Sequence, residues 1–152
     1  MPKEIAMNET HSMNSARCLL SSALVLIAYV AVAADWRPVN AGQDEVVFVD
    51  YESVHHDAGA IKATVLRNYG VTQYLGDWYP HKSKLIVYRF DCDNSSLGIE
   101  QWAFHSDNFG GGRTLWADHV KGDSYMRNAA DAEDRALVGT VCSISAATHA
   151  AG

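Results

Sequence analysis

Apolar and polar side chains alternate with a period of two through most of the chain after residue 44, as expected for strands that bury one face. The segments that follow this pattern are 45–50, 61–69, 84–92, 99–106 and 113–118. In 84–92 the apolar side chains share one face: Ile86, Tyr88, Phe90 and Cys92. Short turns at 53–59, 93–96 and 108–112 join consecutive strands, so the pattern predicts an antiparallel meander and not a βαβ repeat.

The period changes near the C-terminus, where residues 131–144 carry an apolar stripe at helical spacing. The stripe consists of Leu137, Val138, Val141 and Cys142. Asp131 suits a helix N-cap, and Glu133 and Asp134 fall in the first turn, where the helix dipole favours negative charge. The pattern therefore predicts an α+β fold, in which one C-terminal helix follows a single antiparallel sheet and turns Cys142 toward it.

Residues 1–34 have the three parts of a leader with a secretory signal peptide. Arg17 provides the positive flank, residues 18–33 are uncharged and apolar, and the run ends in small residues. We expect cleavage after Ala33 or Ala34, which leaves no membrane span in the mature protein. The alternative is an uncleaved anchor, although the run is shorter than the roughly 20 residues that cross a bilayer.

The remaining chain suits one domain over residues 35–145, followed by a frayed tail of small residues at 146–152. Met13 is a more natural start for the signal than Met1. A content of 48% hydrophobic and 20% charged residues is typical of a globular protein. The net charge of −6, without a cluster of Lys or Arg, argues against nucleic acid as a partner.

The cysteines predict a single disulfide bond. Cys18 leaves with the signal peptide, and export places the remaining pair, Cys92 and Cys142, in an oxidising compartment. Both sulfurs belong to apolar faces, one on a strand and the other on the predicted helix. A bond between them closes a loop of about 50 residues and contributes about 4 kcal/mol in the chain-entropy model. Two free thiols are the alternative.

The order of these segments resembles the surface-adhesin protein E family of Gram-negative bacteria. The similarity rests on Trp36 with Val39, Val47 to Tyr51, Ser53-Val54, Gly59 to Leu66, Ser83-Lys84, Phe90-Asp91-Cys92, Gly110 to Gly112, and Asp131 to Cys142. The resemblance implies an antiparallel meander of about six strands whose concave face holds the C-terminal helix through the disulfide. It also implies a non-enzymatic protein of the periplasm or outer cell surface that binds host matrix or serum proteins such as vitronectin and laminin, and it implies homodimers.

The segment from Gly70 to Pro80 is predicted as a loop with an unusual load of aromatic residues, followed by cations. The candidate binding residues are Trp78, Tyr79, His81, Lys82, Lys84 and Arg89. Aromatic and cationic side chains together are enriched where proteins bind one another. The alternative is that Trp78 and Tyr79 fold back and cap the edge of the sheet.

Other chemistry is weakly indicated. His55, His56 and Asp57 are adjacent, but neighbours on an extended chain point to opposite faces, so we expect no metal site. No nucleophile motif or framed carboxylate pair occurs, and we expect no catalytic residues. The second hypothesis for function is a periplasmic protein that binds a small ligand or haem through His55 or His56.

Overall fold

The computed structural model describes residues 33–76, 78–120 and 126–150. Residues 1–32 of the predicted leader, which include its alternative start at Met13, lie outside the described residues. In the part of the chain that is described, no helix is both long and apolar enough to cross a membrane.

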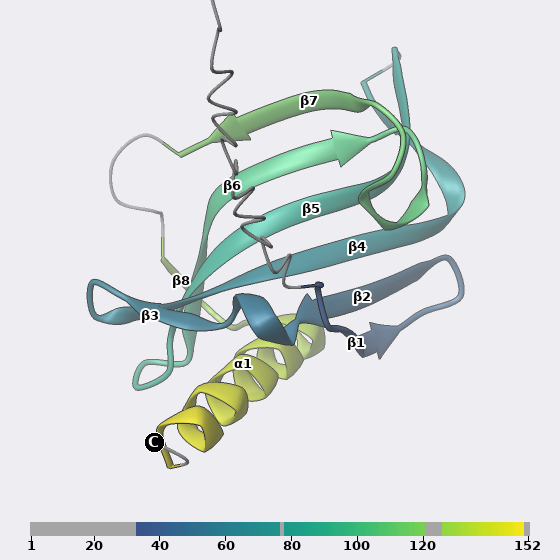
Figure 1. Cartoon of the computed structure of the whole chain (residues 1–152). Coiled ribbons are helices and arrows are strands. Elements are labelled where there is room, and N and C mark those ends of the chain that lie inside the picture. The colour runs from purple at the N-terminus through teal and green to yellow at the C-terminus, as the bar shows by residue number, and fades with distance from the viewer. Residues whose placement is uncertain (1–32, 77, 121–125, 151–152) are drawn as a thin grey trace, which may run out of the picture. The chain divides into compact units, whose positions relative to one another are not determined.

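Within these residues the chain forms eight strands, two short 3-10 turns and one helix (Figure 1). The strands are β1 (Trp36–Ala41), β2 (Glu45–Asp50), β3 (His55–Asp57), β4 (Ala60–Leu75), β5 (Tyr79–Asp91), β6 (Ser96–His105), β7 (Thr114–His119) and β8 (Arg127–Asn128). The turns are η1 (Tyr51–Ser53) and η2 (Asn108–Gly110), and the helix is α1 (Ala132–Ala150).

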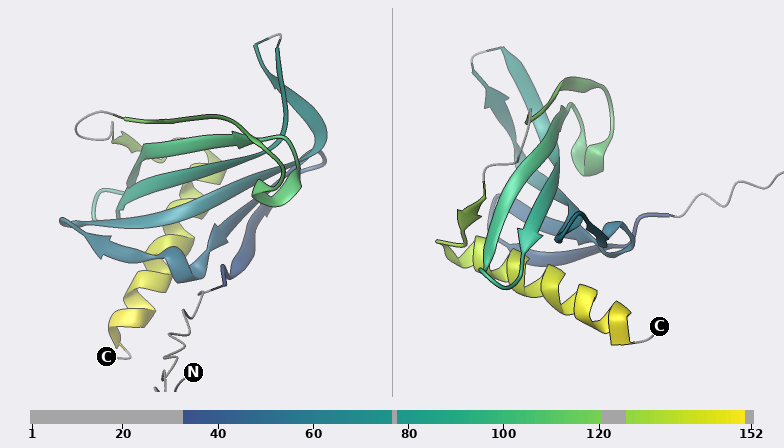
Figure 2. Two further views of the ribbon diagram at one scale, coloured as in Figure 1. Left: turned by 45° about the horizontal axis from the view of Figure 1, so that its top comes forward. Right: turned by 90° about the vertical axis from the view of Figure 1, so that its left-hand side faces the viewer.

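The main strands lie in the order β1-β2-β4-β5-β6-β7, and every neighbouring pair is antiparallel. The short strands add at the sides, β3 to β4 and β8 to β6. The predicted α+β class and the antiparallel meander are therefore confirmed. Figure 2 shows that the sheet is open and curled, with α1 packed against one face.

The structure corrects three boundaries. Trp36–Ala41 forms an edge strand that periodicity missed; Pro38 breaks the alternation there, and the pairing with β2 shifts between Pro38 and Asn40. The predicted loop at 70–80 consists instead largely of the ends of β4 and β5, because a shift in register between Asn68 and Gln73 lets the two strands continue as a long hairpin. The predicted frayed tail is helical through Ala150, since α1 continues without a break.

The core lies between α1 and the face of the sheet that α1 covers, which we call the helix face. Every second residue is buried there from Ile61 to Val65 in β4 and from Ile86 to Phe90 in β5, as the alternation predicted. The sheet contributes Val47, Val49, Ile61, Ala63, Val65, Ile86, Tyr88, Phe90 and Leu97, and the helix contributes Leu137, Val138 and Val141. Each fully buried aliphatic side chain of this kind contributes roughly 1.5–3 kcal/mol.

The predicted disulfide between Cys92 and Cys142 is confirmed. Cys92 directly follows β5, Cys142 lies on α1, and their Cα atoms are 5.8 Å apart. Since 50 residues separate the two cysteines, the bond removes much of the freedom of the unfolded chain. It holds the helix against the sheet, and the alternative of two free thiols is wrong.

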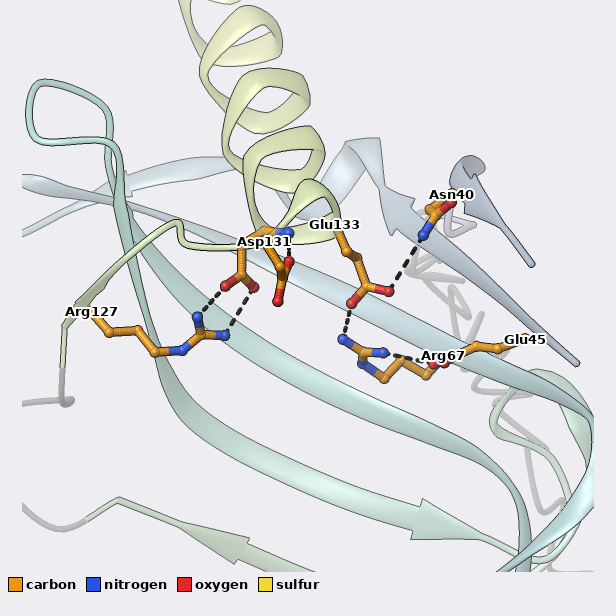
Figure 3. A network of polar contacts seen from close by, with 7 residues as sticks. Asn40, Glu45, Arg67, Arg127, Asp131 and Glu133 are labelled. Carbon is orange, nitrogen blue, oxygen red and sulfur yellow. Dashed lines mark hydrogen bonds and ion pairs between the residues drawn. The ribbon is translucent and has the colours of Figure 1, made fainter.

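Ion pairs hold the N-terminal end of the helix to the sheet (Figure 3). Asp131 caps the helix as predicted, since its Oδ1 accepts a hydrogen bond of 2.7 Å from the backbone N–H of Asp134. Arg127 donates to the carboxylate of Asp134, and Arg67 of β4 donates to Glu133. These contacts orient the first turn of α1 on the sheet.

Arg67 is the centre of this network, because it also donates from Nη1 to Oε1 of Glu45 on β2 at 2.7 Å. Burial by itself lowers the pKa of its guanidinium, but the hydrogen bond to Glu45 and the charges of Glu45 and Glu133 outweigh burial, so the pKa is raised. Arg67 is therefore a fixed positive charge that joins two strands and the helix.

The opposite face of the sheet is covered at one end by the turn η2. Ser83 is fully buried there; its hydroxyl donates to the carbonyl of Asp107 at 2.5 Å and accepts from the N–H of Gly110 at 3.0 Å. Gly110 has φ +71°, and a Cβ at this position would lie 3.1 Å from Leu85. Glycine therefore lets the chain turn tightly against β5 before it enters β7.

Candidate protein-binding surface

The joined ends of β4 and β5, residues 70–76 and 78–82, form a hairpin arm that carries three exposed aromatic side chains. Trp78 is 83% exposed, Tyr74 65% and Tyr79 45%. A soluble domain rarely leaves large apolar side chains together in water unless the surface meets something else. The exposure of Trp78 also contradicts the alternative in which it folds back to cap the sheet.

A hollow of about 550 Å³ lies beside this arm, and we call it the arm hollow. Trp78, Tyr79 and Lys82 line one side, and Asp107 and Arg113, from the connection between β6 and β7, line the other. The hollow thus combines aromatic surface with two cations and one carboxylate. Trp, Tyr and Arg are enriched at protein–protein interfaces, so the arm hollow is the candidate binding site.

The structure brings together three of the six predicted binding residues, Trp78, Tyr79 and Lys82. It does not place His81 in an exposed patch. The imidazole of His81 is 5% exposed, and its ring centroid lies 5.6 Å from that of Tyr69 and 4.7 Å from that of Phe104. His81 points away from solvent because the two aromatic rings enclose it, so it supports the arm from within.

Lys84 and Arg89 lie elsewhere on β5. Lys84 is on the helix face, with Nζ 5.0 Å from the ring centroid of Phe104. Burial, and then the charge of Arg67, lowers the pKa of the Lys84 ammonium. Arg89 lies toward the far end of β5, opposite Lys62 and Gly98. Neither residue lines the arm hollow.

Sequence reasoning did not identify Asp107 and Arg113 as parts of the site. Both follow β6, more than twenty residues after Lys82, and no local pattern links them to the arm. They reach the arm hollow because the antiparallel pairing places the end of β6 beside the start of β5. Only the register between β5 and β6 shows that Asp107 and Arg113 belong to the site.

A second hollow lies on the helix face beyond the end that α1 covers, and we call it the aromatic hollow. It has a volume of about 490 Å³ and is lined by Leu75, Tyr79, Trp102, Phe104, Trp116 and Asp118. The alternation in 99–106 and 113–118 predicted the strands that carry Trp102, Phe104, Trp116 and Asp118, whereas Leu75 and Tyr79 fall in the segment that was predicted as a loop. It did not show that their aromatic face would remain open.

His55 and His56 lie apart from both hollows, at the edge strand β3. His55 Nδ1 is 2.8 Å from the carbonyl oxygen of Ser53, and His56 Nε2 is 2.8 Å from the hydroxyl of Ser145 on α1. The adjacent hollow of about 240 Å³ is smaller than most ligand sites. In the described residues, no three His, Cys, Asp or Glu side chains are grouped so that they could hold a metal ion.

The open sheet, the tethered helix and the exposed aromatic arm define the class of the protein: a small disulfide-bonded α+β domain with a candidate binding surface. The family model for surface-adhesin protein E matches residues 36–143, so the chain belongs to the surface-adhesin protein E family. Membership makes the chain an adhesin-like, exported or cell-surface binding protein, which agrees with the family resemblance found in the sequence.

Solved structures of Haemophilus influenzae protein E are similar to this chain. Crystal form II is 14% identical, covers 73% of this chain and 96% of its own, and has a TM-score of 0.48. The selenomethionine form is 15% identical, with coverages of 72% and 94% and a TM-score of 0.49. Protein E from non-typeable Haemophilus influenzae is 13% identical, with coverages of 79% and 97% and a TM-score of 0.44. No curated protein matches the chain.

Proposed function

We propose that this domain is exported by its leader, cleaved after Ala33 or Ala34, and binds a host matrix or serum protein through the hairpin arm. The observation that carries the proposal is the exposure of Trp78 and Tyr79 beside Lys82 on one arm. Family membership supports an adhesin-like role, and the arm supplies a surface of suitable chemistry. The candidate partners are vitronectin and laminin.

The physical basis is the free energy that aromatic side chains release when a partner removes them from water. A Trp and a Tyr each bury a large area with few rotatable bonds, so little conformational entropy opposes their contacts. Lys82 and Arg113, on the two sides of the arm hollow, add attraction for carboxylates of the partner. We therefore expect Trp78 to dominate the affinity and the two cations to affect mainly the association rate.

The test is binding of the purified, oxidised domain to immobilised vitronectin and laminin, with saturation measured by surface plasmon resonance. We expect Trp78→Ala to weaken binding about tenfold or more. Lys82→Gln should slow association and reduce its dependence on salt. Arg135→Gln, which removes an exposed cation from α1, is the matched control and should bind as the unmodified domain does.

The outcome that rejects the proposal is a folded domain that shows no saturable binding to either protein. Intact mass measured without reductant on the exported protein tests the compartment separately. A mass that begins at Ala34 or Asp35, with both thiols oxidised, agrees with export and cleavage. A mass that retains residues 1–33 contradicts the cleavage site.

A further inference from the structure

The outer edge of β7 is open to a partner. β7 is the last strand in the order of the sheet, and its inner side pairs with β6 from His105–Thr114 to Gln101–His119. Along the described residues no strand pairs with its outer side, and Figure 1 shows β7 at the border of the sheet. Apart from half-buried Leu115, every side chain of β7 is exposed. The unpaired N–H and C=O groups of such an edge are the groups to which an extended peptide adds as a further strand.

The aromatic hollow lies directly beside this edge. Phe104 is paired with Trp116, and Trp102 is paired with Asp118. Trp116 and Asp118 therefore lie on the helix face, beside the two rings of β6. Tyr79 of the hairpin arm also lines the hollow. A strand added to β7 would therefore place every second side chain at the mouth of the aromatic hollow.

The chemistry of the aromatic hollow favours a cation. The faces of Trp, Tyr and Phe rings attract positive charge, and Phe104 already has the ammonium of Lys84 at 5.0 Å from its centroid. Trp102 and Trp116 remain for a second cation. Asp118 supplies the counter-charge: its Oδ1 accepts the N–H of His119 at 2.8 Å, and in the described chain no Lys or Arg forms an ion pair with it.

The net charge of the chain also favours a positively charged partner, because it is −6. We infer that the β7 edge and the aromatic hollow form a binding site for a basic, extended segment of a partner protein, which adds to β7 as a strand and inserts a Lys or Arg side chain between Trp102 and Trp116, against Asp118. This inference rests on the proposed protein-binding function and names the chemistry of the partner at a second surface, which shares Tyr79 with the arm hollow.

The experiment uses labelled eight-residue peptides and the intact oxidised domain, with affinity measured by fluorescence anisotropy. One peptide alternates Lys with Val, the second replaces Lys with norleucine, and the third replaces Lys with Glu. We expect the Lys peptide to bind about tenfold more tightly than the norleucine peptide, with an affinity that falls as salt is added, and the Glu peptide to bind more weakly still. Methylation of the peptide amides that face β7 should abolish binding, because strand addition needs those donors.

Variants of the domain locate the site. Asp118→Asn keeps the acceptor for His119 but removes the charge, and we expect it to weaken the Lys peptide about three- to fivefold. Trp116→Ala should weaken it about tenfold, and Trp116→Phe should restore most of the loss because a ring face is retained. Asp44→Asn, an equal change of charge at the turn between β1 and β2, is the matched control and should have no effect.

Several outcomes overturn the inference: equal affinity for the Lys and norleucine peptides, equal effects of Asp118→Asn and Asp44→Asn, binding that survives methylation, or occupancy by a neutral oligosaccharide in place of the peptide. The two proposals can fail separately. If vitronectin or laminin binds through Trp78 while the Lys peptide does not bind, the β7 inference alone is wrong. If the Lys peptide binds with the expected charge preference while neither matrix protein binds, the β7 site is supported and the role of the arm is rejected.

Discussion

The two ends of the helix face differ in what covers them. At one end, Val65, Ile86 and Phe90 are at most 1% exposed beneath α1. At the other end, where β7 and the C-terminal part of β6 lie beyond the helix, Trp116 of the aromatic hollow is 48% exposed. One sheet with one pattern of alternation thus produces a core at one end and an open aromatic surface at the other.

The difference shows that the alternation determines which side chains share a face of the sheet. Whether those side chains are buried depends on which segment packs on that face. The covered end is held by a covalent bond and by charged contacts, from Cys92 to Cys142 and from Arg67 to Glu133. Nothing comparable is attached over the aromatic hollow in the described residues. We therefore expect changes at the covered end to alter stability and changes at the open end to alter binding.

The largest loss of stability at the covered end should come from removing the disulfide. A variant with both Cys92→Ala and Cys142→Ala frees the helix from the sheet and restores the entropy of a 50-residue loop to the unfolded chain. The free energy of unfolding should fall by about 4 kcal/mol, and the melting temperature by more than about 10 °C. Calorimetry of the oxidised domain and the variant measures both. Equal melting temperatures would show that the bond does not hold the covered end together.

A matched pair of substitutions compares the two ends directly. Ile86→Ala removes a side chain that is 1% exposed beneath α1, and we expect it to cost about 3 kcal/mol because a cavity remains. Trp116→Ala removes a larger side chain that is already half in water, and should cost only about 1 kcal/mol. Urea unfolding of the two variants gives both values. If Trp116→Ala proves the more damaging, the open end is part of the core and the comparison fails.

The network at the start of α1 should contribute less than the core. Arg67→Met leaves the carboxylates of Glu45 and Glu133 without their shared partner, and we expect a loss of about 2 kcal/mol. The control is Asp35→Asn, which removes the exposed ion pair between Asp35 and Arg37, leaves the Arg37 guanidinium over the ring of Tyr51, and should cost no measurable stability. Chemical denaturation at low salt measures both variants. Equal effects of the two substitutions would mean that the Arg67 network acts as an ordinary surface ion pair.

The smallest effect should be a dependence of stability on pH through His105, on β6. Burial lowers the pKa of this imidazole, and neither ring nitrogen has a hydrogen-bond partner among the residues that the structure describes. Because folding favours the neutral ring, its contribution is complete above the ordinary histidine pKa of about 6.5 and declines as the pH falls below that value.

The measurement for His105 is the free energy of unfolding of the unmodified domain and of His105→Leu at pH 7.5 and pH 5.5. We expect the unmodified domain to lose stability relative to the variant at the lower pH, since the two proteins differ only at position 105. A difference that stays constant between the two pH values would contradict a neutral, buried His105.

Particular residues show how far the sequence could predict this fold. Ile86, Tyr88 and Phe90 were correctly assigned to one buried face because the period of a strand is local. Asp131 was correctly assigned as the N-cap because capping is also local, joining residues only three positions apart. The strand at Trp36–Ala41 was missed because Pro38 interrupts the local pattern, and its pairing with β2 is a contact between separate segments.

In the candidate site, too, the sequence predicted what depends on a local pattern and missed what depends on distant contacts. Trp78, Tyr79 and Lys82 were identified from the composition of one short segment, and the structure gathers them around one hollow. His81, two residues from Tyr79, was grouped with them although its ring is enclosed by Tyr69 and Phe104. Composition cannot separate such neighbours, because the direction of a side chain depends on strand register and on partners far along the chain.

The sequence alone therefore determined the antiparallel meander, the C-terminal helix, the Cys92–Cys142 bond and the family, since each depends on local period, on the oxidising compartment expected from the leader, or on the order of short segments. Only the tertiary structure decided that β4 and β5 extend into an exposed arm, that Arg113 and Trp78 line one hollow, and that the helix leaves Trp116 of β7 uncovered. The reason is physical: a period shows which side chains share a face, while exposure depends on which distant segment packs on that face.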